Sequence, residues 1–383
     1  MKTLFLLNVT AITPRGLQPN HTIQIQDGRI TAVLPNEDVH ELPADVEIFD
    51  ACGAYAAPGF IDLHIHGYAG HGPENANADD LLAMSAALAK QGVCAFCPTL
   101  YCGTEEEMAH ILRATVGAFG RETGARLLGY HLEGPFISPQ KPGVMKPQDI
   151  LAPSVDVLAR LYEAAQGKVC SMTLAPERPG MEPVIAFCRE HRILMQAGHT
   201  NATYEEFLAA TRQGITHATH LFNAMSPFNH RAPGAAGAVL LHPQISCEIL
   251  ADGVHVHPDV VRFLGRIKPP QQIALVTDAL KPTGQEKGPF YANGEEVILD
   301  GGVWKRKADK VIAGSALTML KGVQNLVRFG FTLAQAAACA AAVPARLLGL
   351  NTRGQVAPGM RADLTLFDKD FHLQAVFING ERK

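Results

Sequence analysis

Residues 273–278 read Ile273-Ala274-Leu275-Val276-Thr277-Asp278, four consecutive apolar residues that lead into a hydroxyl and a carboxylate. A strand with one solvated face alternates apolar and polar residues, whereas this run is apolar on both faces. Strands of that kind occur in parallel sheets, because the helices that connect parallel strands cover the sheet. The segment therefore predicts an α/β fold.

Seven further segments of similar character precede it along the chain. The strand candidates are 60–66, 93–99, 126–132, 169–174, 193–196, 217–221, 246–251 and 273–277. Helical candidates with apolar residues three and four positions apart lie between most of them, at 78–91, 105–119, 155–166, 183–191, 203–213 and 258–267. Eight strands that alternate with helices predict a TIM-type (β/α)8 barrel, whose active site lies at the carboxyl ends of the strands.

The two ends of the chain have a different pattern, with short alternating segments and tight turns. Asp27-Gly28 separates two such segments near the N-terminus, and Asn379-Gly380 follows another near the C-terminus. Both dipeptides favour two-residue hairpin turns. We predict a small β-sandwich domain formed by both termini, with residues 1–55 plus 347–383, and a catalytic barrel domain over residues 56–346.

Composition excludes several classes of protein. Hydrophobic residues make up 47% of the 383 and charged residues 18%, which excludes a disordered chain or a coiled coil as the main architecture. Thirty-three Lys and Arg against 37 Asp and Glu give a net charge of −4, so no overall field attracts nucleic acid or an acidic membrane. Eight scattered cysteines suit a reducing compartment, and neither a signal peptide nor a membrane span is indicated. We expect a cytoplasmic protein.

Metal-ligating side chains stand at the ends of five predicted strands. They are His64 and His66 on the first strand, Glu133 on the third, His199 after the fifth, His220 on the sixth and Asp278 on the eighth. The spacing of two between the first two histidines places both imidazoles on one side of the strand. A divalent transition metal prefers such nitrogen and oxygen ligands, and an open coordination position lets bound water ionise near neutral pH.

Each of these residues also has an ordinary structural explanation. The His-x-His motif is weak evidence by itself, Glu133 lies in a Glu-Gly-Pro turn, and His199 and Asp278 suit helix caps. Chance placement of all six at strand ends is much less plausible than a metal site. The sequence therefore predicts one or two divalent metal ions per subunit.

Several motifs resemble those of the amidohydrolase superfamily. They are residues 58–67 (PGFIDLHIHG), 131–136 (HLEGPF), 197–199 (AGH), 220–225 (HLFNAM), 252–255 (DGVH) and 277–279 (TDA). Within the superfamily they are most similar to the N-acetylglucosamine-6-phosphate deacetylases, over nearly the whole chain. The resemblance implies hydrolysis of the acetamide of N-acetylglucosamine 6-phosphate to glucosamine 6-phosphate and acetate, in amino-sugar catabolism.

The resemblance also implies roles for the predicted ligands. Glu133, His199 and His220 would hold one metal ion, and His64 and His66 would help to hold a second one beside Glu133 and Asp278. Amide hydrolysis needs a proton carrier for the leaving amine, and we assign this catalytic role to the Asp278 carboxylate. Zinc is the expected metal, while Fe, Co or Mn suit the same ligands.

Substrate-binding positions follow from the same resemblance. Asn223, the Ala224 backbone, Arg231 and His255 match family positions that bind the sugar phosphate, and the Arg231 guanidinium has the planar fork that suits phosphate oxygens. In relatives a neighbouring subunit supplies part of the phosphate site. We therefore expect a phosphosugar substrate and a homodimer.

One position departs from the family pattern. Where the family usually continues with Gly-Ala-His, this chain has Gly143-Val144-Met145. The family histidine is thought to polarise the substrate carbonyl, and Met145 cannot donate a hydrogen bond. That task would then fall to a second metal ion, to another donor such as His71, or to a shifted substrate pose. We favour the second metal ion, bound by His64 and His66.

Three other functions are alternatives to this deacetylase activity. An N-acetylgalactosamine-6-phosphate deacetylase would share the same ligands, because it differs only in the sugar epimer. A cyclic-amide hydrolase is disfavoured, since such enzymes commonly carry a carboxylated lysine at the end of strand four, whereas Lys168 precedes that strand here. A non-catalytic scaffold is disfavoured because such relatives typically lose metal ligands.

Overall fold

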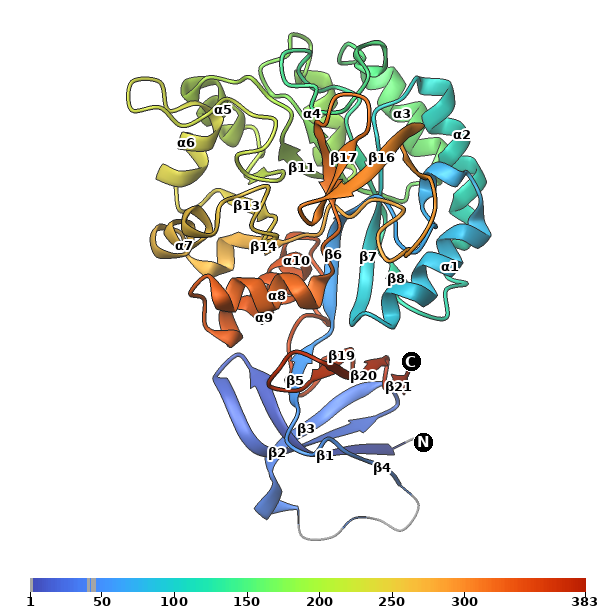
Figure 1. Cartoon of the computed structure of the whole chain (residues 1–383), viewed down its shortest axis with the longest axis vertical. Helices are drawn as coiled ribbons and strands as arrows, with labels where there is room; N and C mark the ends of the chain where they lie inside the picture. Colours follow the sequence, from blue (N-terminus) through green and yellow to red (C-terminus); the bar gives the residue numbers. More distant parts are fainter. Residues whose placement is uncertain (1–2, 40–41, 43–45) are drawn as a thin grey trace.

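The computed structural model describes residues 3–39, 42 and 46–383, so that residues 1–2, 40–41 and 43–45 of the predicted segment 1–55 lie outside it. A parallel barrel with surrounding helices forms the large upper body in Figure 1. A second sheet lies below the barrel and contains strands from both ends of the chain, and a small third sheet lies at the top (Figure 1).

The barrel follows the predicted order of strands. Its strands are β6 (Phe60–Ile65), β7 (Val93–Leu100), β8 (Arg126–Leu127), β9 (Tyr130–Glu133), β10 (Val169–Leu174), β11 (Leu194–Ala197), β12 (His217–Ala218), β13 (Ser246–Ile249) and β14 (Ile273–Leu275). Neighbouring strands are parallel, in the order β14-β13-β12-β11-β10-β9-β7-β6, with β8 beside β7. The TIM-type barrel is confirmed, and the predicted strand 126–132 is divided into β8 and β9.

The first and last barrel strands meet just beyond their carboxyl ends. The Asp278 amide donates to the His64 carbonyl at 2.8 Å, and the His66 amide donates to the Ala279 carbonyl at 3.0 Å. The Asp62 carboxylate accepts from the hydroxyl of Thr277 at 2.6 Å on the same seam. Closure of the barrel therefore brings the His-x-His segment against Asp278, although more than 200 residues separate them.

The helices pack outside the barrel. They are α1 (Ala78–Ala89), α2 (Glu105–Thr115), α3 (Val155–Ala164), α4 (Glu182–Glu190), α5 (Tyr204–Arg212), α6 (Gly234–Leu241), α7 (Pro258–Ile267), α8 (Met319–Arg328), α9 (Leu333–Ala340) and α10 (Ala342–Leu347). Five short 3-10 helices accompany them: η1 (Asn36–Asp38), η2 (Pro73–Asn75), η3 (Val116–Ala118), η4 (Pro147–Asp149) and η5 (Pro270–Gln272). Capping boxes begin α2 at Thr104, α5 at Thr203 and α9 at Thr332, since each threonine and a Glu or Gln three residues later bond each other's backbone.

The lower sheet joins the two ends of the chain. Its strands are β1 (Thr3–Thr13), β2 (Gly16–Gln26), β3 (Arg29–Pro35), β4 (Glu47–Asp50), β5 (Tyr55–Pro58), β19 (Leu364–Phe367), β20 (Leu373–Ile378) and β21 (Glu381–Arg382). β5 pairs with β1 on one side and with β19 on the other, and apolar residues from both ends form a core of their own. The predicted small domain from both termini is confirmed, whereas its limits at residues 55 and 347 stay a prediction.

Both predicted hairpin turns are present in this sheet. Asp27 and Gly28, between β2 and β3, have φ values of 48° and 76°, and Asn379 and Gly380, between β20 and β21, have 54° and 76°. Two successive residues with positive φ are what a type I′ turn requires, and Asp-Gly and Asn-Gly adopt it at the lowest cost.

A third sheet was not predicted. Strands β15 (Phe290–Ala292), β16 (Glu295–Asp300), β17 (Val303–Arg306) and β18 (Ile312–Ser315) form an antiparallel sheet between β14 and α8, at the top of the barrel (Figure 1). Trp304 anchors it, because its buried indole donates from Nε1 to the Thr283 hydroxyl at 2.9 Å. The Ser315 amide donates to the Asp278 carbonyl at 2.8 Å, so this sheet also fixes the backbone after β14.

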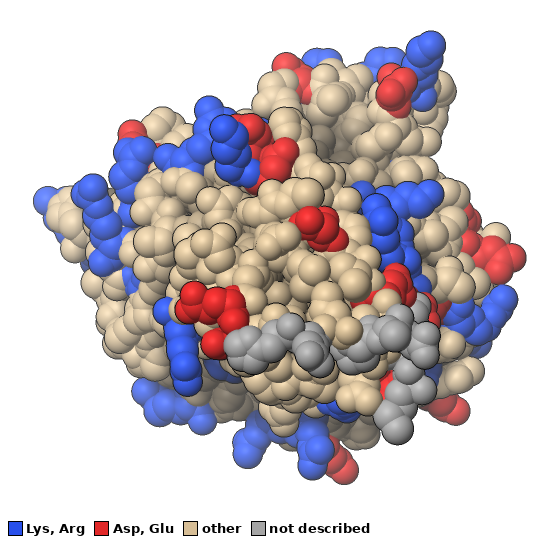
Figure 2. Space-filling model, turned by 90° about the horizontal axis from the view of Figure 1, so that it is seen from below, with Lys and Arg blue, Asp and Glu red and all other residues tan. Residues whose placement is uncertain are grey.

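The surface carries both charges. Figure 2 shows the molecule from below, where Lys and Arg side chains are interspersed with Asp and Glu over the described part of that face. This part of the face therefore has no continuous basic area of the kind that binds a nucleic-acid backbone. Among the described residues, no helix has the length and hydrophobicity needed to cross a bilayer.

Candidate metal centre and active site

Glu133, His199 and His220 converge at the mouth of the barrel. The Glu133 Oε1 atom lies 3.2 Å from His199 Nε2 and 3.1 Å from His220 Nε2, and the two imidazole nitrogens are 3.1 Å apart. In a tetrahedral site with metal-ligand bonds of about 2.0–2.1 Å, the ligand atoms lie about 3.3 Å apart. The three atoms thus form a triangle of the size that one face of such a site has. All three side chains are buried.

His64 and His66 form a second group on the other side of Glu133. His66 Nε2 lies 3.2 Å from Glu133 Oε2 and 3.3 Å from Asp278 Oδ1, while His64 Nε2 lies 3.4 and 3.6 Å from Oε1 and Oδ1 of the same two carboxylates. His64 Nε2 is buried and has no hydrogen-bond partner among the described residues. An imidazole nitrogen left between two carboxylates fits a bound cation. Glu133 stands between both groups and can bridge them.

Hydrogen bonds on the opposite ring nitrogens orient two of these imidazoles. His199 Nδ1 lies 2.9 Å from the Lys141 carbonyl oxygen, and His64 Nδ1 lies 3.0 Å from Glu248 Oε2. Because both partners are acceptors, each can hold a proton on Nδ1, and Nε2 is the ring atom that faces the centre. Metal-binding histidines in proteins are held in this way.

Glu248 is a site residue that the sequence analysis missed. It lies inside β13, is completely buried, and accepts from the His220 amide at 3.1 Å as well as from His64. One carboxylate oxygen therefore connects the two ligand groups. The available signal was a lone acidic residue in the otherwise apolar run from Cys247 to Ala251.

The backbone is strained at three of the converging residues. His199, His220 and Asp278 have φ values of 46°, 27° and 49°, in the left-handed region that residues with a side chain rarely adopt. Such strain persists only where the surrounding structure enforces it, and it is concentrated at functional sites. The sequence had predicted His220 at the end of its strand. β12 ends earlier, at Ala218, so His220 lies in the turn beyond the strand.

The electrostatic environment keeps the two carboxylates ionised. Burial raises the pKa of Asp278, but the nearby His64 and His66 outweigh burial and the pKa is lowered. The pKa of Glu133 lies well below its usual value, because the attraction of His64 and hydrogen bonds from His199 and His220 outweigh burial. Ionised carboxylates are the form that binds a metal ion or accepts a proton.

A pocket of about 180 Å³ opens above this centre. Glu133, His66, His199, His220 and Asp278 line its floor, and its walls include Met145, Asn223, Ala224, His255 and residues 312–314 of β18. Of the predicted substrate residues, the structure therefore brings Met145, Asn223, Ala224 and His255 together, while Arg231 is exposed and does not line this pocket. His71 also lies outside the lining, where its Nδ1 is 2.6 Å from Asp80.

His255 is held in the pocket wall by Asp252. Its Nδ1 lies 2.5 Å from Asp252 Oδ2, and the Asp252 Oδ1 atom accepts from the amides of Val254 and His255 at 2.9 Å. Burial opposes a charged imidazole, but the hydrogen bond and the charge of Asp252 outweigh burial and raise the pKa of His255. His255 can therefore present a positive charge and an N–H donor to an anionic ligand.

Comparison with known proteins assigns the family. The sequence pattern described as the Amidohydrolase family matches residues 55–383. The chain belongs to this family. Members of the family depend on metal ions, and this amidohydrolase carries the two candidate ligand groups described above.

The relatives cover nearly the whole of this amidohydrolase. N-acetylglucosamine-6-phosphate deacetylase of Bacillus subtilis (strain 168) is 32% identical, over 99% of this chain and 96% of that protein. N-acetylgalactosamine-6-phosphate deacetylase of Escherichia coli O157:H7 is also 32% identical, over 97% of this chain and 96% of that protein. A solved mutant of N-acetyl-D-glucosamine-6-phosphate deacetylase from Mycobacterium smegmatis, in complex with N-acetyl-D-glucosamine-6-phosphate, is similar with a TM-score of 0.89, 30% identity and coverage of 100% and 98% of the two chains.

Proposed function

We propose that this amidohydrolase hydrolyses N-acetyl-D-glucosamine 6-phosphate to D-glucosamine 6-phosphate and acetate, in amino-sugar catabolism. The observation that carries the proposal is the convergence of two metal-ligand groups with the ionised Asp278 in one pocket, whose wall holds His255 as a donor for an anion. The relatives named above act on N-acetylhexosamine 6-phosphates. The N-acetylgalactosamine epimer is the alternative substrate, because one of these relatives carries that name.

Two metal subsites are proposed around Glu133. His199 and His220 complete the first, and His64, His66 and Asp278 complete the second. A divalent metal bound there would supply a polarised carbonyl and a water molecule that ionises near neutral pH. Zinc is the expected metal in one or both subsites, while Fe, Co and Mn suit the same ligands.

Asp278 is proposed as the proton carrier. Its carboxylate is ionised, so it can accept the proton that the attacking water loses and pass it to the leaving amide nitrogen. Two backbone hydrogen bonds hold Asp278 in place. The Asp278 amide donates to the His64 carbonyl, and the Ser315 amide donates to the Asp278 carbonyl. The carbon-nitrogen bond then breaks, acetate keeps the new oxygen and the sugar keeps the amine.

The lining of the pocket supports a proposal for the substrate residues. We propose that Asn223, the Ala224 backbone and His255 bind the sugar and its phosphate inside the pocket. Arg231 is exposed outside it, which is consistent with a phosphate contact that is completed at an interface between subunits.

Met145 lines the pocket near the ligand His199. Met145 is 4% exposed. The backbone at Gly143, two residues earlier, passes close to the His199 ring, because a Cβ atom built on this glycine would lie 2.9 Å from His199 Cε1. Met145 offers no donor to the substrate carbonyl, and His71 is bound to Asp80. We propose that His64 and His66 would hold a metal ion that supplies the carbonyl polarisation instead.

A homodimer is proposed. Large apolar side chains are exposed at Phe228 before α6, at Leu241 at the end of α6 and at Phe263 on α7. Figure 1 shows α6 and α7 on the same flank of the barrel. Arg231 lies in the same part of the chain. A Phe263→Glu substitution should convert dimer to monomer in light scattering and weaken substrate binding, whereas Leu299→Glu, at a similarly exposed residue on β16, should do neither. A wild-type protein that is monomeric would exclude the proposal.

A cytoplasmic location is proposed. All eight cysteines lie in the described part of the chain, and each is a free thiol. A reducing compartment keeps thiols in this state. The substrate class fits as well, since phosphosugars are intermediates of intracellular metabolism.

The experiment that tests the proposed function measures acetate release from N-acetylglucosamine 6-phosphate and N-acetylgalactosamine 6-phosphate in parallel, with the metal content of the enzyme assayed. Faster turnover of the glucosamine derivative is expected. Faster turnover of the other epimer selects the alternative. If metal-loaded enzyme turns over neither compound, the substrate assignment is wrong although the fold and metal centre stand.

A further inference from the structure

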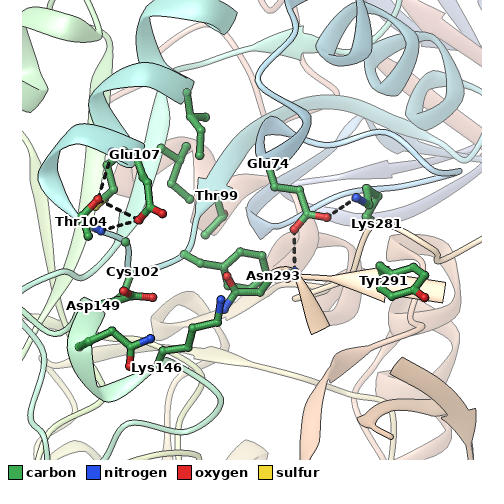
Figure 3. A pocket seen from close by; sticks show the side chains of 17 residues that line it. Glu74, Thr99, Cys102, Thr104, Glu107, Lys146, Asp149, Lys281, Tyr291 and Asn293 are labelled. Carbon is green, nitrogen blue, oxygen red and sulfur yellow. Dashed lines mark hydrogen bonds and ion pairs between the residues drawn. The ribbon is translucent and has the colours of Figure 1, made fainter. Parts of the chain in front are cut away.

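A second cavity lies beside the metal pocket. It has a volume of about 560 Å³, against 180 Å³ for the pocket above the metal centre, and lies between the chain after β7, η4 and the β15–β16 hairpin. Figure 3 shows side chains from these segments, among them Thr104, Asp149 and Asn293, around one space. No residue of the two metal-ligand groups lines it.

Tyr101 separates the cavity from the metal pocket. Its buried ring stacks on His66 with the ring centroids 3.7 Å apart and an angle of 5° between the planes, and it lines both spaces. Beside it, the Cys102 thiol donates to the Glu133 carbonyl at 3.3 Å. The cavity is thus a separate chamber whose inner wall is the back of the second metal subsite.

The charges in the cavity are not balanced. Glu74 and Lys281 form an ion pair of 2.5 Å, which Figure 3 shows on one side. On the other side the residue Asp149 is 7% exposed, its carboxylate accepts no hydrogen bond from any described residue, and Glu107 lies near it. Burial, together with the charge of Glu107, raises the pKa of Asp149, although Lys146 lowers it.

Lys146 is the only cation of the described cavity lining besides Lys281. Its ammonium makes no ion pair within 4.0 Å among the described residues, so Asp149 keeps a free carboxylate that faces the cavity. With Glu74, Glu107 and Asp149 against Lys146 and Lys281, the lining carries one net negative charge. An unpaired carboxylate on a cavity wall favours a cationic donor.

The rest of the lining suits a small polyhydroxyl compound. Tyr101 and Tyr291 offer aromatic faces, while Met108 and Ile111 are apolar. The Asn293 Nδ2 donor is buried and has no partner among the described residues. Aromatic faces attract ammonium groups and pack against the apolar faces of sugar rings. A volume of 560 Å³ is within the range of small-molecule sites.

We propose that this cavity is a second binding site, for a small unphosphorylated amino sugar or a similar hydroxylated primary amine. Its ammonium group binds the Asp149 carboxylate beside Glu107, and its hydroxyls meet Asn293. A phosphate group would face the excess negative charge, so the site differs in ligand class from the metal pocket. The proposal is independent of the function proposed above.

The test is calorimetric titration of the metal-loaded enzyme with glucosamine. Saturable binding is expected for the wild type and for Asp156→Asn, a control on the exposed first turn of α3. Asp149→Asn should bind at least about tenfold more weakly, because it loses a charged hydrogen bond. N-acetylglucosamine, which lacks the ammonium group, should not displace glucosamine from this cavity.

A second variant guards against misfolding of Asp149→Asn. Asn293 lines the cavity from the turn between β15 and β16 with a φ of 52°, which glycine adopts easily, so Asn293→Gly should fold and still weaken glucosamine binding several-fold. Absence of saturable binding in the wild type overturns the proposal. Binding that neither variant weakens also overturns it, since the amine would then occupy another site.

Discussion

Replacement of Glu248 by glutamine should weaken metal binding in both subsites. The wild-type carboxylate accepts from His64 Nδ1 at 3.0 Å and from the His220 amide at 3.1 Å, and it is completely buried. Glutamine keeps the shape of the side chain but removes its charge. Each hydrogen bond to a charged acceptor then becomes a neutral one, which is weaker by about 1 kcal/mol. One bond supports a ligand of each subsite, so each subsite should lose about 1 kcal/mol, or roughly fivefold in metal affinity. The two losses together give about 2 kcal/mol, or roughly 30-fold, within the usual range of about 10–100-fold for such partners.

Competition with a chromophoric chelator measures this affinity, and elemental analysis gives the number of metal ions per chain. Glu122→Gln is the matched control, because Glu122 is also a buried carboxylate but is paired with Arg126, away from the barrel mouth. Its metal affinity should equal that of the wild type. If folded Glu248→Gln binds metal as tightly as the wild type, or if the control loses as much, Glu248 does not organise the ligands.

Three further outcomes are expected. Asp278→Asn should lower kcat by about 10²–10⁴-fold in acetate release, since it removes the proton carrier, and unchanged turnover would exclude that role. His64→Asn should lower both metal content and turnover, because a metal ion held by the proposed second subsite would supply the carbonyl polarisation of the family histidine that Met145 replaces; unaltered turnover in metal-replete enzyme would exclude this. The pKa of Asp252 is lowered and that of His255 is raised by their pairing, which outweighs burial in both. The ion pair therefore stabilises the fold fully between about pH 3.9 and 6.5. Its contribution falls as pH drops through the pKa of Asp252 or rises through that of His255, so Asp252→Asn should lower Tm more at pH 5.5 than at pH 9.

The sequence predicted the barrel well because its strands are short and apolar and its helices are amphipathic. The segment 169–174 coincides with β10, and 258–267 coincides with α7. Local patterns are less informative where tertiary contacts decide the structure. α6 is rich in Ala and Gly, with buried small residues on most of its surface, and so has no periodic apolar stripe to detect.

The candidate ligands were predictable because a barrel brings the ends of its strands together. Glu248 was not, since it lies within β13, and only the inward orientation of its side chain places it below the ligands. The sheet β15–β18 was also missed, although Asn293-Gly294 marks the turn between β15 and β16 with φ values of 52° and 72°. Its strands contact the barrel mouth through Ser315, a contact that no local pattern encodes.

The lower sheet has a consequence for how the protein is made. β5 leads through Gly59 directly into β6, and it pairs with β19, which the ribosome synthesises about 300 residues later. Until then, one edge of β5 has no partner, and the strand that positions the His-x-His segment is supported from one side only. A strand synthesised long after the first barrel strand therefore completes its support, so that a chain truncated before β19 should remain incompletely folded despite containing every proposed metal ligand.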